Sequence, residues 1–291
     1  MSYKIIFTMF LLFSLTSCSS LPEKKLRISA TTWVGYTPLF YANAKGWLRQ
    51  HNIKLLNVSS LAENMYIYKA KNSDAYVGTQ YEYNLLHQEN RSLRPIMMFD
   101  RSYGGDMILS NVSIETLQNT AQEIDTYLEV DSINSTILKD FIKIYSIKEE
   151  NINYINKDQS QIDLLKVSKK PTIIVTYVPY NITLQKSGFK EIASTKDGLD
   201  IFVVDAMFTT AEIFSKHKNQ FIELKKIVDI SIEALKNDPK EFYETIKPYM
   251  LNMDYNEFEA SLHDIIWINK DITPGMKERM NQAGLQTRDL I

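Results

Sequence analysis

Cysteine is almost missing from this sequence of 291 residues, which contains only Cys18. A single cysteine excludes a disulfide within the chain and leaves no thiol after residue 18 for a metal site or a catalytic nucleophile. The four histidines lack the spacing of metal ligands and are scattered at His51, His87, His217 and His263. We therefore expect no metal site and no cofactor.

Charge of one sign is not in excess either, because 33 lysine and arginine residues face 35 aspartate and glutamate residues. The resulting net charge of −2 gives no support for a nucleic-acid partner. No Ser-His-Asp pattern and no pair of carboxylates typical of acid-base catalysis is recognisable, which argues against an enzyme. The length suits two lobes of roughly 100–170 residues each better than one small core.

Long hydrophobic runs are missing as well, apart from one short run at residues 5–13. This run is far shorter than the ~20 residues of a transmembrane helix and is typical of a secretion signal. The sequence LTSC that ends at Cys18 resembles the bacterial lipobox. The resemblance implies a signal peptide at 1–17 and a lipidated Cys18 with a tether at 18–26, so that the protein is exported and attached to a membrane. The alternative is a chance cysteine beside an ordinary cleavage site.

What the sequence does contain is an alternation of strand-like and helix-like segments, which predicts an α/β fold with mainly parallel sheets. A strand at 26–30, for example, precedes a helix that begins with the hydroxyl of Thr37 and with Pro38 at the first helical position. Glycine is scarce, with only nine residues, so the pair Gly104-Gly105 indicates backbone with unusual dihedral angles.

This glycine pair is interpreted as a crossing from one lobe to the other, and Asp197-Gly198 as the turn that precedes the return. The sequence therefore predicts a first lobe at 27–106 that is completed by 200–291, and a second lobe at 107–199. No internal repeat and no low-complexity segment is recognisable.

Four segments resemble periplasmic solute-binding proteins for nitrate, sulfonates, taurine and the pyrimidine precursor of thiamine. In the family's order they are WVGYTPLFYANAKGW at 33–47, SDAYVG at 73–78, DRSYGGD at 100–106 and TYVPY at 176–180. The resemblance implies a two-lobed type II periplasmic-binding-protein fold with two interlobe crossovers. The chain departs from the family's pattern at Asn72, where a glycine is usual, and at Val178, where an acidic residue is usual.

Ligands of open α/β sheets bind beyond the carboxyl ends of the strands, where loops and helix N-termini converge. Backbone N–H groups at helix starts hold polar or anionic groups, and aromatic rings provide flat apolar walls. Applied to the predicted strands, this rule nominates as ligand-binding residues Trp33, Gly35, Tyr36, Ser60, Gln80, Ser132, Ser135, Tyr177 and Tyr180. The resemblance of the segment at 100–106 to the family's hinge motif adds Ser102 and Asp106, and the carboxylate beside Ser60 adds Glu63.

Several of these residues have a purely structural alternative that the sequence leaves open. Ser60 with Glu63 is also the pattern of a helix capping box. Trp33 at a strand end also suits the core, and Ser102 with Asp106 also suits the satisfaction of backbone groups at the crossover.

The function predicted from these features is extracytoplasmic capture of a small organic solute by hinge closure, for delivery to an ABC importer by a monomeric protein. The candidate cleft holds rings and hydroxyls but no arginine, which favours a thiamine-pyrimidine-like solute over a sulfonate and makes nitrate least expected. Glu63 and Asp106 are candidates to accept from an exocyclic amine.

A periplasmic sensory protein, which presents its ligand-bound form to a membrane receptor kinase or cyclase, is the alternative. Ser19 after the lipidated cysteine directs some Gram-negative lipoproteins to the outer membrane, which suits an importer poorly. The anchor is therefore expected in the cell membrane or the outer membrane, with the protein facing the periplasm or the exterior.

Overall fold

The computed structural model describes residues 24–251, 253–269 and 272–291. The predicted signal peptide at 1–17 and the predicted lipidation site Cys18 lie outside these residues. Within the described part of the chain, no helix combines the length and the apolar character that crossing a membrane requires.

The first lobe, as we use the term, is a six-stranded sheet in the order β11-β4-β10-β3-β1-β2 together with the helices that cover it. The strands are β1 (Leu26–Thr31), β2 (Ile53–Val58), β3 (Ala75–Thr79), β4 (Leu93–Ser102), β10 (Val204–Thr210) and β11 (Ile265–Trp267). β1 is parallel to β2 and β3, whereas β10 is antiparallel to β3 and β4, and β11 is antiparallel to β4.

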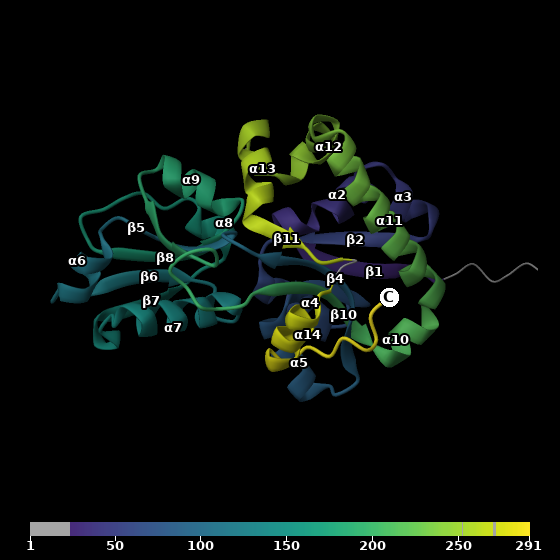
Figure 1. Ribbon diagram of the computed structural model, residues 1–291, viewed down its shortest axis with the longest axis horizontal. Helices are drawn as coiled ribbons and strands as arrows, with labels where there is room; N and C mark the ends of the chain where they lie inside the picture. Colours follow the sequence, from purple (N-terminus) through teal and green to yellow (C-terminus); the bar gives the residue numbers. More distant parts are fainter. Residues whose placement is uncertain (1–23, 252, 270–271) are drawn as a thin grey trace, which may run out of the picture.

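Helices cover both faces of this sheet (Figure 1). On one face, Phe40, Phe221 and Phe242 of three helices share a core with the strands, and on the other Tyr83 and Met280 join a second core. The helices of the first face are α2 (Thr37–Ala44), α3 (Trp47–Gln50), α11 (Lys218–Asn237) and α12 (Pro239–Ile246), and those of the second are α4 (Leu61–Lys69), α5 (Gln80–Glu89) and α14 (Pro274–Gln282). Shorter elements of the lobe are η2 (Val34–Tyr36), α10 (Ala211–Lys216), η4 (Lys247–Tyr249), α13 (Tyr255–Ser261) and η5 (Leu262–Asp264).

The second lobe is a five-stranded sheet in the order β7-β6-β8-β5-β9 with its helices, and it lies beside the first lobe in Figure 1. β6 is parallel to β7 and β8, whereas β5 is antiparallel to β8 and β9. The strands are β5 (Asp106–Ser110), β6 (Ile124–Leu128), β7 (Ile152–Asn156), β8 (Thr172–Tyr177) and β9 (Lys190–Ser194). The helices are α6 (Ile114–Asn119), α7 (Ile133–Tyr145), η3 (Glu149–Asn151), α8 (Gln159–Ile162) and α9 (Tyr180–Lys186).

The chain passes between the two sheets twice, from β4 to β5 through residues 103–105 and from β9 to β10 through residues 195–203. Gly104 has a φ of +119°, a left-handed conformation that glycine adopts without strain, and it follows the end of β4. The predicted α/β class with two crossovers is confirmed. The residue limits of the predicted lobes stay a prediction.

Both sheets are mixed, which differs from the expectation of mainly parallel sheets. The antiparallel strands β5 and β10 are the ones that directly follow the two crossovers. A strand that enters a sheet from the neighbouring lobe starts at the interlobe edge, where the parallel strands end, and therefore runs in the opposite direction.

Candidate functional site between the lobes

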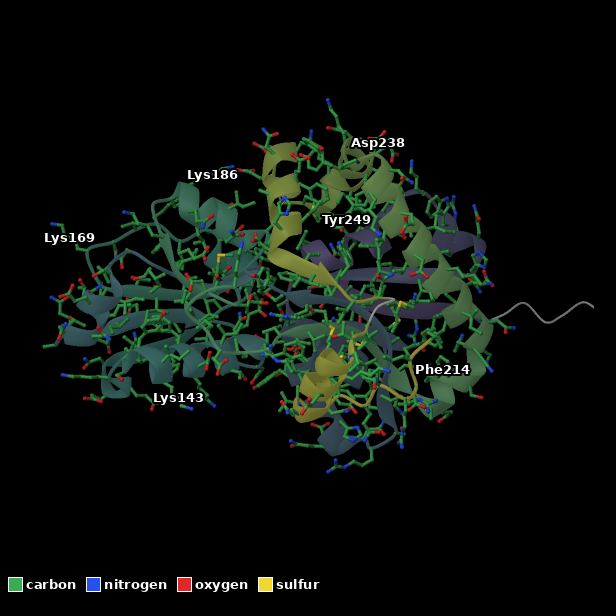
Figure 2. All side chains as sticks on the ribbon, in the orientation of Figure 1. Lys143, Lys169, Lys186, Phe214, Asp238 and Tyr249 are labelled. Atoms are coloured by element: carbon green, nitrogen blue, oxygen red, sulfur yellow. The ribbon has the colours of Figure 1, made fainter. Side chains whose placement is uncertain are left out.

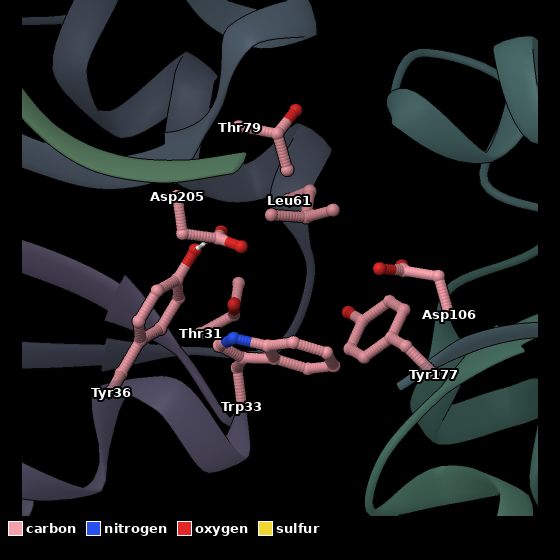
Figure 3. Close-up of a pocket in the computed structure, with 8 residues that line it drawn as sticks. All are labelled: Thr31, Trp33, Tyr36, Leu61, Thr79, Asp106, Tyr177 and Asp205. Carbon is pink, nitrogen blue, oxygen red and sulfur yellow. Dashed lines mark hydrogen bonds between the residues drawn. The ribbon is translucent and has the colours of Figure 1, made fainter. Parts of the chain in front are cut away.

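A small cavity lies where the two lobes meet, and we call it the interlobe cavity (Figure 3). Its volume is about 10 Å³, which is room for about one water molecule. Both sheets contribute to its wall, which is lined by Thr31, Trp33, Tyr36, Leu61, Thr79, Asp106, Tyr177 and Asp205.

The interlobe cavity is built on one antiparallel residue pair from each sheet. In the first sheet Asp205 of β10 pairs with Thr79 of β3, and in the second Asp106 of β5 pairs with Tyr177 of β8. Each pair joins the amino end of a crossover strand to the carboxyl end of its neighbour, and those ends face the opposite lobe. The two aspartates therefore enter the cavity from opposite sides, as Figure 3 shows.

Aromatic rings from the two lobes meet edge to face in this cavity. The ring centroids of Trp33 and Tyr177 are 6.0 Å apart at an interplanar angle of 74°, and Tyr180 packs against Tyr177 at 5.4 Å and 89°. These separations and angles are favourable for aromatic pairs. Trp33 is fixed from behind, because its indole Nε1 donates to Asp100 Oδ1 at 3.1 Å. Gly35 makes this contact possible, since a Cβ atom there would lie 1.9 Å from Asp100 Oδ2.

Buried carboxylates dominate the electrostatics of the site. Burial raises the pKa of Asp106 to about 7, against the hydrogen bond with Ser102 that lowers it. Burial also raises the pKa of Asp205 well above its ordinary value, and the neighbouring Asp100 raises it further. Desolvation acts in the same direction on the pKa of Asp100. Tyr36 donates from its hydroxyl to Asp205 and partly compensates the burial of that carboxylate.

Two further buried carboxylates connect the lobes reciprocally. Glu82 of the first lobe accepts from the backbone N–H of Ile133 at the start of α7 at 3.0 Å. Glu129 of the second lobe accepts from the N–H of Leu61 at the start of α4 at 3.3 Å and from that of Gln159 at 3.1 Å. Each lobe thus places a carboxylate on a helix N-terminus of the other lobe, where the helix dipole favours negative charge. Burial nevertheless raises the pKa of Glu129 to about 8.

A larger depression of about 590 Å³ lies between α4 and the loops that follow β6 and β7, and we call it the acidic hollow. Four of its side chains are acidic and none is basic, and it is lined by Ser59, Ser60, Ala62, Glu63, Tyr66, Ile67, Ala70, Asn72, Glu129, Asp131, Asn156 and Asp158. Tyr66 bridges the lobes across it, because its hydroxyl donates to Asp131 at 2.9 Å. Glu129 bonds the backbone of Leu61, which lines the interlobe cavity, so the hollow and the cavity adjoin.

Two buried hydroxyls that line the interlobe cavity have no hydrogen-bond partner. They are the phenol of Tyr177 and the Oγ1 of Thr31, whose residues are 2% and 1% exposed. Figure 3 shows the Tyr177 hydroxyl on the side of its ring that faces the cavity. Buried polar atoms are nearly always satisfied in folded proteins, so these two hydroxyls are available to a bound molecule.

The interlobe cavity brings together four of the predicted ligand-binding residues, namely Trp33, Tyr36, Asp106 and Tyr177. Gly35 lies directly behind them, against Asp100 and Trp33. Ligand contact by these residues stays a prediction, but their placement agrees with it.

Ser60 and Glu63 line the acidic hollow instead. Ser60 caps α4 by accepting from the N–H of Glu63 at 3.0 Å. The Glu63 carboxylate accepts from the N–H and the hydroxyl of Ser59 at 2.7 and 2.6 Å. In a capping box it would accept from the N–H of Ser60, so the second bond of the box is made by the residue before the N-cap.

The other predicted site residues do not line the interlobe cavity and make local contacts. Gln80 bonds Phe202 O and Val204 N on the returning chain, and Ser102 shares a bond of 2.7 Å with Thr195 at the crossovers. The rest cap or brace the second lobe: Ser132 accepts from Asn134 N, Ser135 donates to Val130 O, and Tyr180 packs on Tyr177.

Sequence reasoning nominated neither Asp205 nor Thr31 and Leu61. Asp205 directly follows the apolar run at 201–204 that indicated the returning strand, and only the antiparallel pairing of β10 with β3 places it at the interlobe edge. Asp205 could have been nominated from its place at the start of a strand that returns from a crossover, because the first residues of such a strand lie beside the carboxyl ends of the parallel strands.

No known family's sequence model and no curated protein sequence matches the chain. Solved structures do match. The ligand-binding component of an ABC-type import system from Staphylococcus aureus, solved with zinc bound, has a TM-score of 0.70 at 12% identity and covers 89% of this chain and 90% of its own. The alkanesulfonate-binding protein SsuA from Xanthomonas axonopodis pv. citri, bound to MOPS, has a TM-score of 0.69 at 9% identity over 93% and 96%.

A Candida albicans gene product that exhibits the generic periplasmic binding protein fold has a TM-score of 0.63 at 12% identity, over 91% of each chain. At such low identities the likeness concerns the fold. The two sheets, the two crossovers and the cavity between them agree with it. The chain therefore has the periplasmic binding protein fold.

Proposed function

We propose that the protein captures a small organic solute between its two lobes outside the cytoplasm and performs no catalysis. The observation that supports this most directly is the interlobe cavity, to which both sheets contribute rings and polar groups. The fold of the similar proteins, one a ligand-binding component of an ABC-type import system and one an alkanesulfonate-binding protein, points the same way.

Capture requires the lobes to move. Pockets for small organic ligands usually measure about 300–1,000 Å³, whereas the interlobe cavity measures about 10 Å³. The two connections at 103–105 and 195–203 are the proposed hinge, because the chain passes between the two sheets only there within the described residues. We infer that a solute enters when rotation about these connections separates Trp33 from Tyr177.

We propose delivery to an ABC importer as the purpose of capture, with presentation to a membrane receptor kinase or cyclase as the alternative. Co-purification from membranes after cross-linking separates the two, because an importer predicts a permease as the captured partner and sensing predicts a receptor. The protein is expected to act as a monomer.

The capture proposal is tested by calorimetry with 4-amino-5-hydroxymethyl-2-methylpyrimidine, thiamine, taurine, ethanesulfonate and nitrate as probes. For the probe that binds, Trp33→Ala and Tyr177→Ala should each weaken binding at least tenfold, about 1.4 kcal/mol, because each removes one wall of the cavity. Tyr154→Ala is the matched control, since Tyr154 is 46% exposed on β7. Unchanged affinity in both cavity variants would refute the assigned site.

We also propose that Cys18 is lipidated, on the motif at the end of the N-terminal apolar run. Cys18→Ala should leave a precursor that incorporates no fatty acid in metabolic labelling, whereas Ser20→Ala should label like the natural protein. Normal labelling of Cys18→Ala would contradict the proposal.

A further inference from the structure

We propose that the solute captured between the lobes is an organic cation, such as a protonated amine or a quaternary ammonium compound. This inference rests on the proposed function, because it specifies the chemical class of solute for the same cavity. It does not rest on the resemblance to other proteins, since it follows from the charges and unpaired groups of this cavity.

The interlobe cavity is lined by acidic side chains and by no basic ones. Asp106 and Asp205 line it, Asp100 lies directly behind Trp33, and no lysine, arginine or histidine is among its lining residues. In the part of the chain that the structure describes, no lysine or arginine side chain is buried. Lysines such as Lys143 and Lys169 project from the outer surface of the second lobe (Figure 2).

Such carboxylates are costly to bury in ionised form without a partner. Their hydrogen-bond donors are few: Asp100 has the Trp33 indole, Asp205 has the Tyr36 hydroxyl and Asp106 has Ser102. A cation between Asp106 and Asp205 supplies the missing positive charge from within the cavity. An anion such as a sulfonate would instead bring a further negative charge beside these three carboxyl groups in the same desolvated space.

The two unpaired hydroxyls provide independent evidence that the cavity is shaped for a hydrogen-bonding ligand. Tyr177 OH and Thr31 Oγ1 are buried without a partner, and they approach the cavity from opposite lobes. A hydroxyl oxygen accepts N–H groups. A protonated amine therefore satisfies these oxygens and the carboxylates together, whereas a quaternary ammonium compound has no N–H group and interacts with the carboxylates and the rings alone.

The rings favour an organic cation over a metal ion. Trp33, Tyr36 and Tyr177 surround the space between the aspartates, and aromatic faces attract ammonium groups. Among the residues that the structure describes, no three acidic, histidine or cysteine side chains are arranged to hold a metal ion.

The acidic hollow extends the negative field outward from the cavity. Glu63, Glu129, Asp131 and Asp158 are among its lining residues, none of which is basic, and Glu129 bonds the backbone of the cavity residue Leu61. A groove with one sign of charge raises the local concentration of ligands of the opposite sign. The hollow therefore lies where it would guide a cation toward the cavity.

The test uses probe pairs of nearly equal shape that differ in charge. One pair is choline and its uncharged isostere 3,3-dimethyl-1-butanol. The other is 4-amino-5-aminomethyl-2-methylpyrimidine and its hydroxymethyl analogue, with ethylammonium and ethanesulfonate added as a small cation and anion. Calorimetry at pH 8 should show the cationic member of a pair binding at least tenfold more tightly than its partner, and ethanesulfonate should not bind.

Substitutions of the cavity aspartates test whether the preference for cationic probes arises in the interlobe cavity. Asp106→Asn and Asp205→Asn keep the side-chain shape and should each weaken the cationic probe at least tenfold while leaving a neutral probe within about threefold. Glu233→Gln, on the exposed face of α11, is the control and should change neither. Thermal unfolding of each variant verifies that it folds.

The number of protons released on binding is a further measurement, and it would not change if the aspartates had only a structural role. Binding of a cation favours ionised carboxylates, so protons should be released to the buffer at pH 7. The binding enthalpies measured in phosphate and in Tris should therefore differ by the number of protons released multiplied by the difference between the ionisation enthalpies of the two buffers. The difference should be smaller in Asp106→Asn.

Each outcome decides between the two proposals. Tighter binding of the neutral or anionic member overturns the cation inference and leaves solute capture intact. A cationic probe whose affinity is unchanged in both aspartate variants also overturns it. Binding of none of the probes, cationic, neutral or anionic, counts against solute capture and against the cation inference with it.

Discussion

Gly35 is the residue on which the arrangement of Trp33 depends. A Cβ atom at this position would lie 1.9 Å from Asp100 Oδ2 and 2.6 Å from Trp33 Nε1, distances that real structures do not tolerate. Both neighbours are buried and joined by a hydrogen bond, so neither yields without breaking it. The first segment that resembled known binding proteins therefore needs its glycine for steric reasons, not for a left-handed φ.

Gly35→Ala should accordingly lower the free energy of unfolding by about 1–3 kcal/mol, the usual cost of overpacking a core. Gly275→Ala is the matched control, because no atom lies within 4 Å of a Cβ there and the position is in the first turn of α14. The control should be neutral or stabilise by up to about 1 kcal/mol. Urea unfolding of both variants measures the difference, and equal stability would show that Asp100 and Trp33 yield easily.

At the scale of elements, a comparison of two helix N-caps can distinguish a structural role of Ser60 at the start of α4 from a ligand-binding role. Its hydroxyl accepts from the N–H of Glu63 at 3.0 Å, and Ser113 makes the equivalent bond to Thr116 at 3.2 Å on the surface of the second lobe. Ser60→Ala and Ser113→Ala should each cost about 1 kcal/mol of unfolding free energy, the usual value of an N-cap.

The affinity of the two variants for a probe that binds the natural protein is then measured by calorimetry. The cap bond alone predicts the same affinity in the natural protein and in both variants. A loss of affinity confined to Ser60→Ala would contradict the purely structural role and would support the ligand contact predicted from the sequence.

Much of the element order could be predicted, because caps, prolines and apolar runs are local signals. These signals predict strands at 26–30, 53–58, 75–78 and 172–177, and β1, β2, β3 and β8 lie there. β5, β9 and β11 were not predicted. β5 begins with a buried aspartate straight after the glycine pair, β9 starts with Lys190 and Glu191 at a sheet edge, and β11 has three residues, so none shows a regular alternation.

Local sequence signals predicted only part of the candidate site. Trp33, Tyr36 and Tyr177 follow or end strands that the sequence reveals. Asp205 and Asp100 depend on the pairing of strands that are about 100 residues apart in the chain, which is tertiary information.

At the scale of the whole molecule, buried carboxylates make the contact between the lobes sensitive to pH. The pKa values of about 7 for Asp106 and about 8 for Glu129 are raised above their ordinary values, so the form with the lobes in contact binds more protons than a form in which these groups are hydrated. This contribution is complete at low pH and is lost as the pH rises through about 7 to 8. The groups around Asp106 add to the effect, because Asp100, Asp205 and Glu82 are acidic as well.

Without added solute, the radius of gyration from small-angle scattering should therefore increase between pH 5 and pH 8.5. The double variant Asp106→Asn with Glu129→Gln should show a smaller increase, because its amides do not ionise. An increase of equal size in the natural protein and the double variant would contradict this explanation.

For the proposed capture of a solute, the small volume of the interlobe cavity sets an expected limit on the rate. A space of about 10 Å³ admits no organic molecule, so association proceeds only through the fraction of molecules whose lobes are apart. The apparent dissociation constant then equals the intrinsic one divided by that fraction, and an open population of about one per cent weakens apparent affinity about a hundredfold. At high solute concentration the observed capture rate levels off at the rate of opening, which makes the hinge, and not diffusion, the limit on supply.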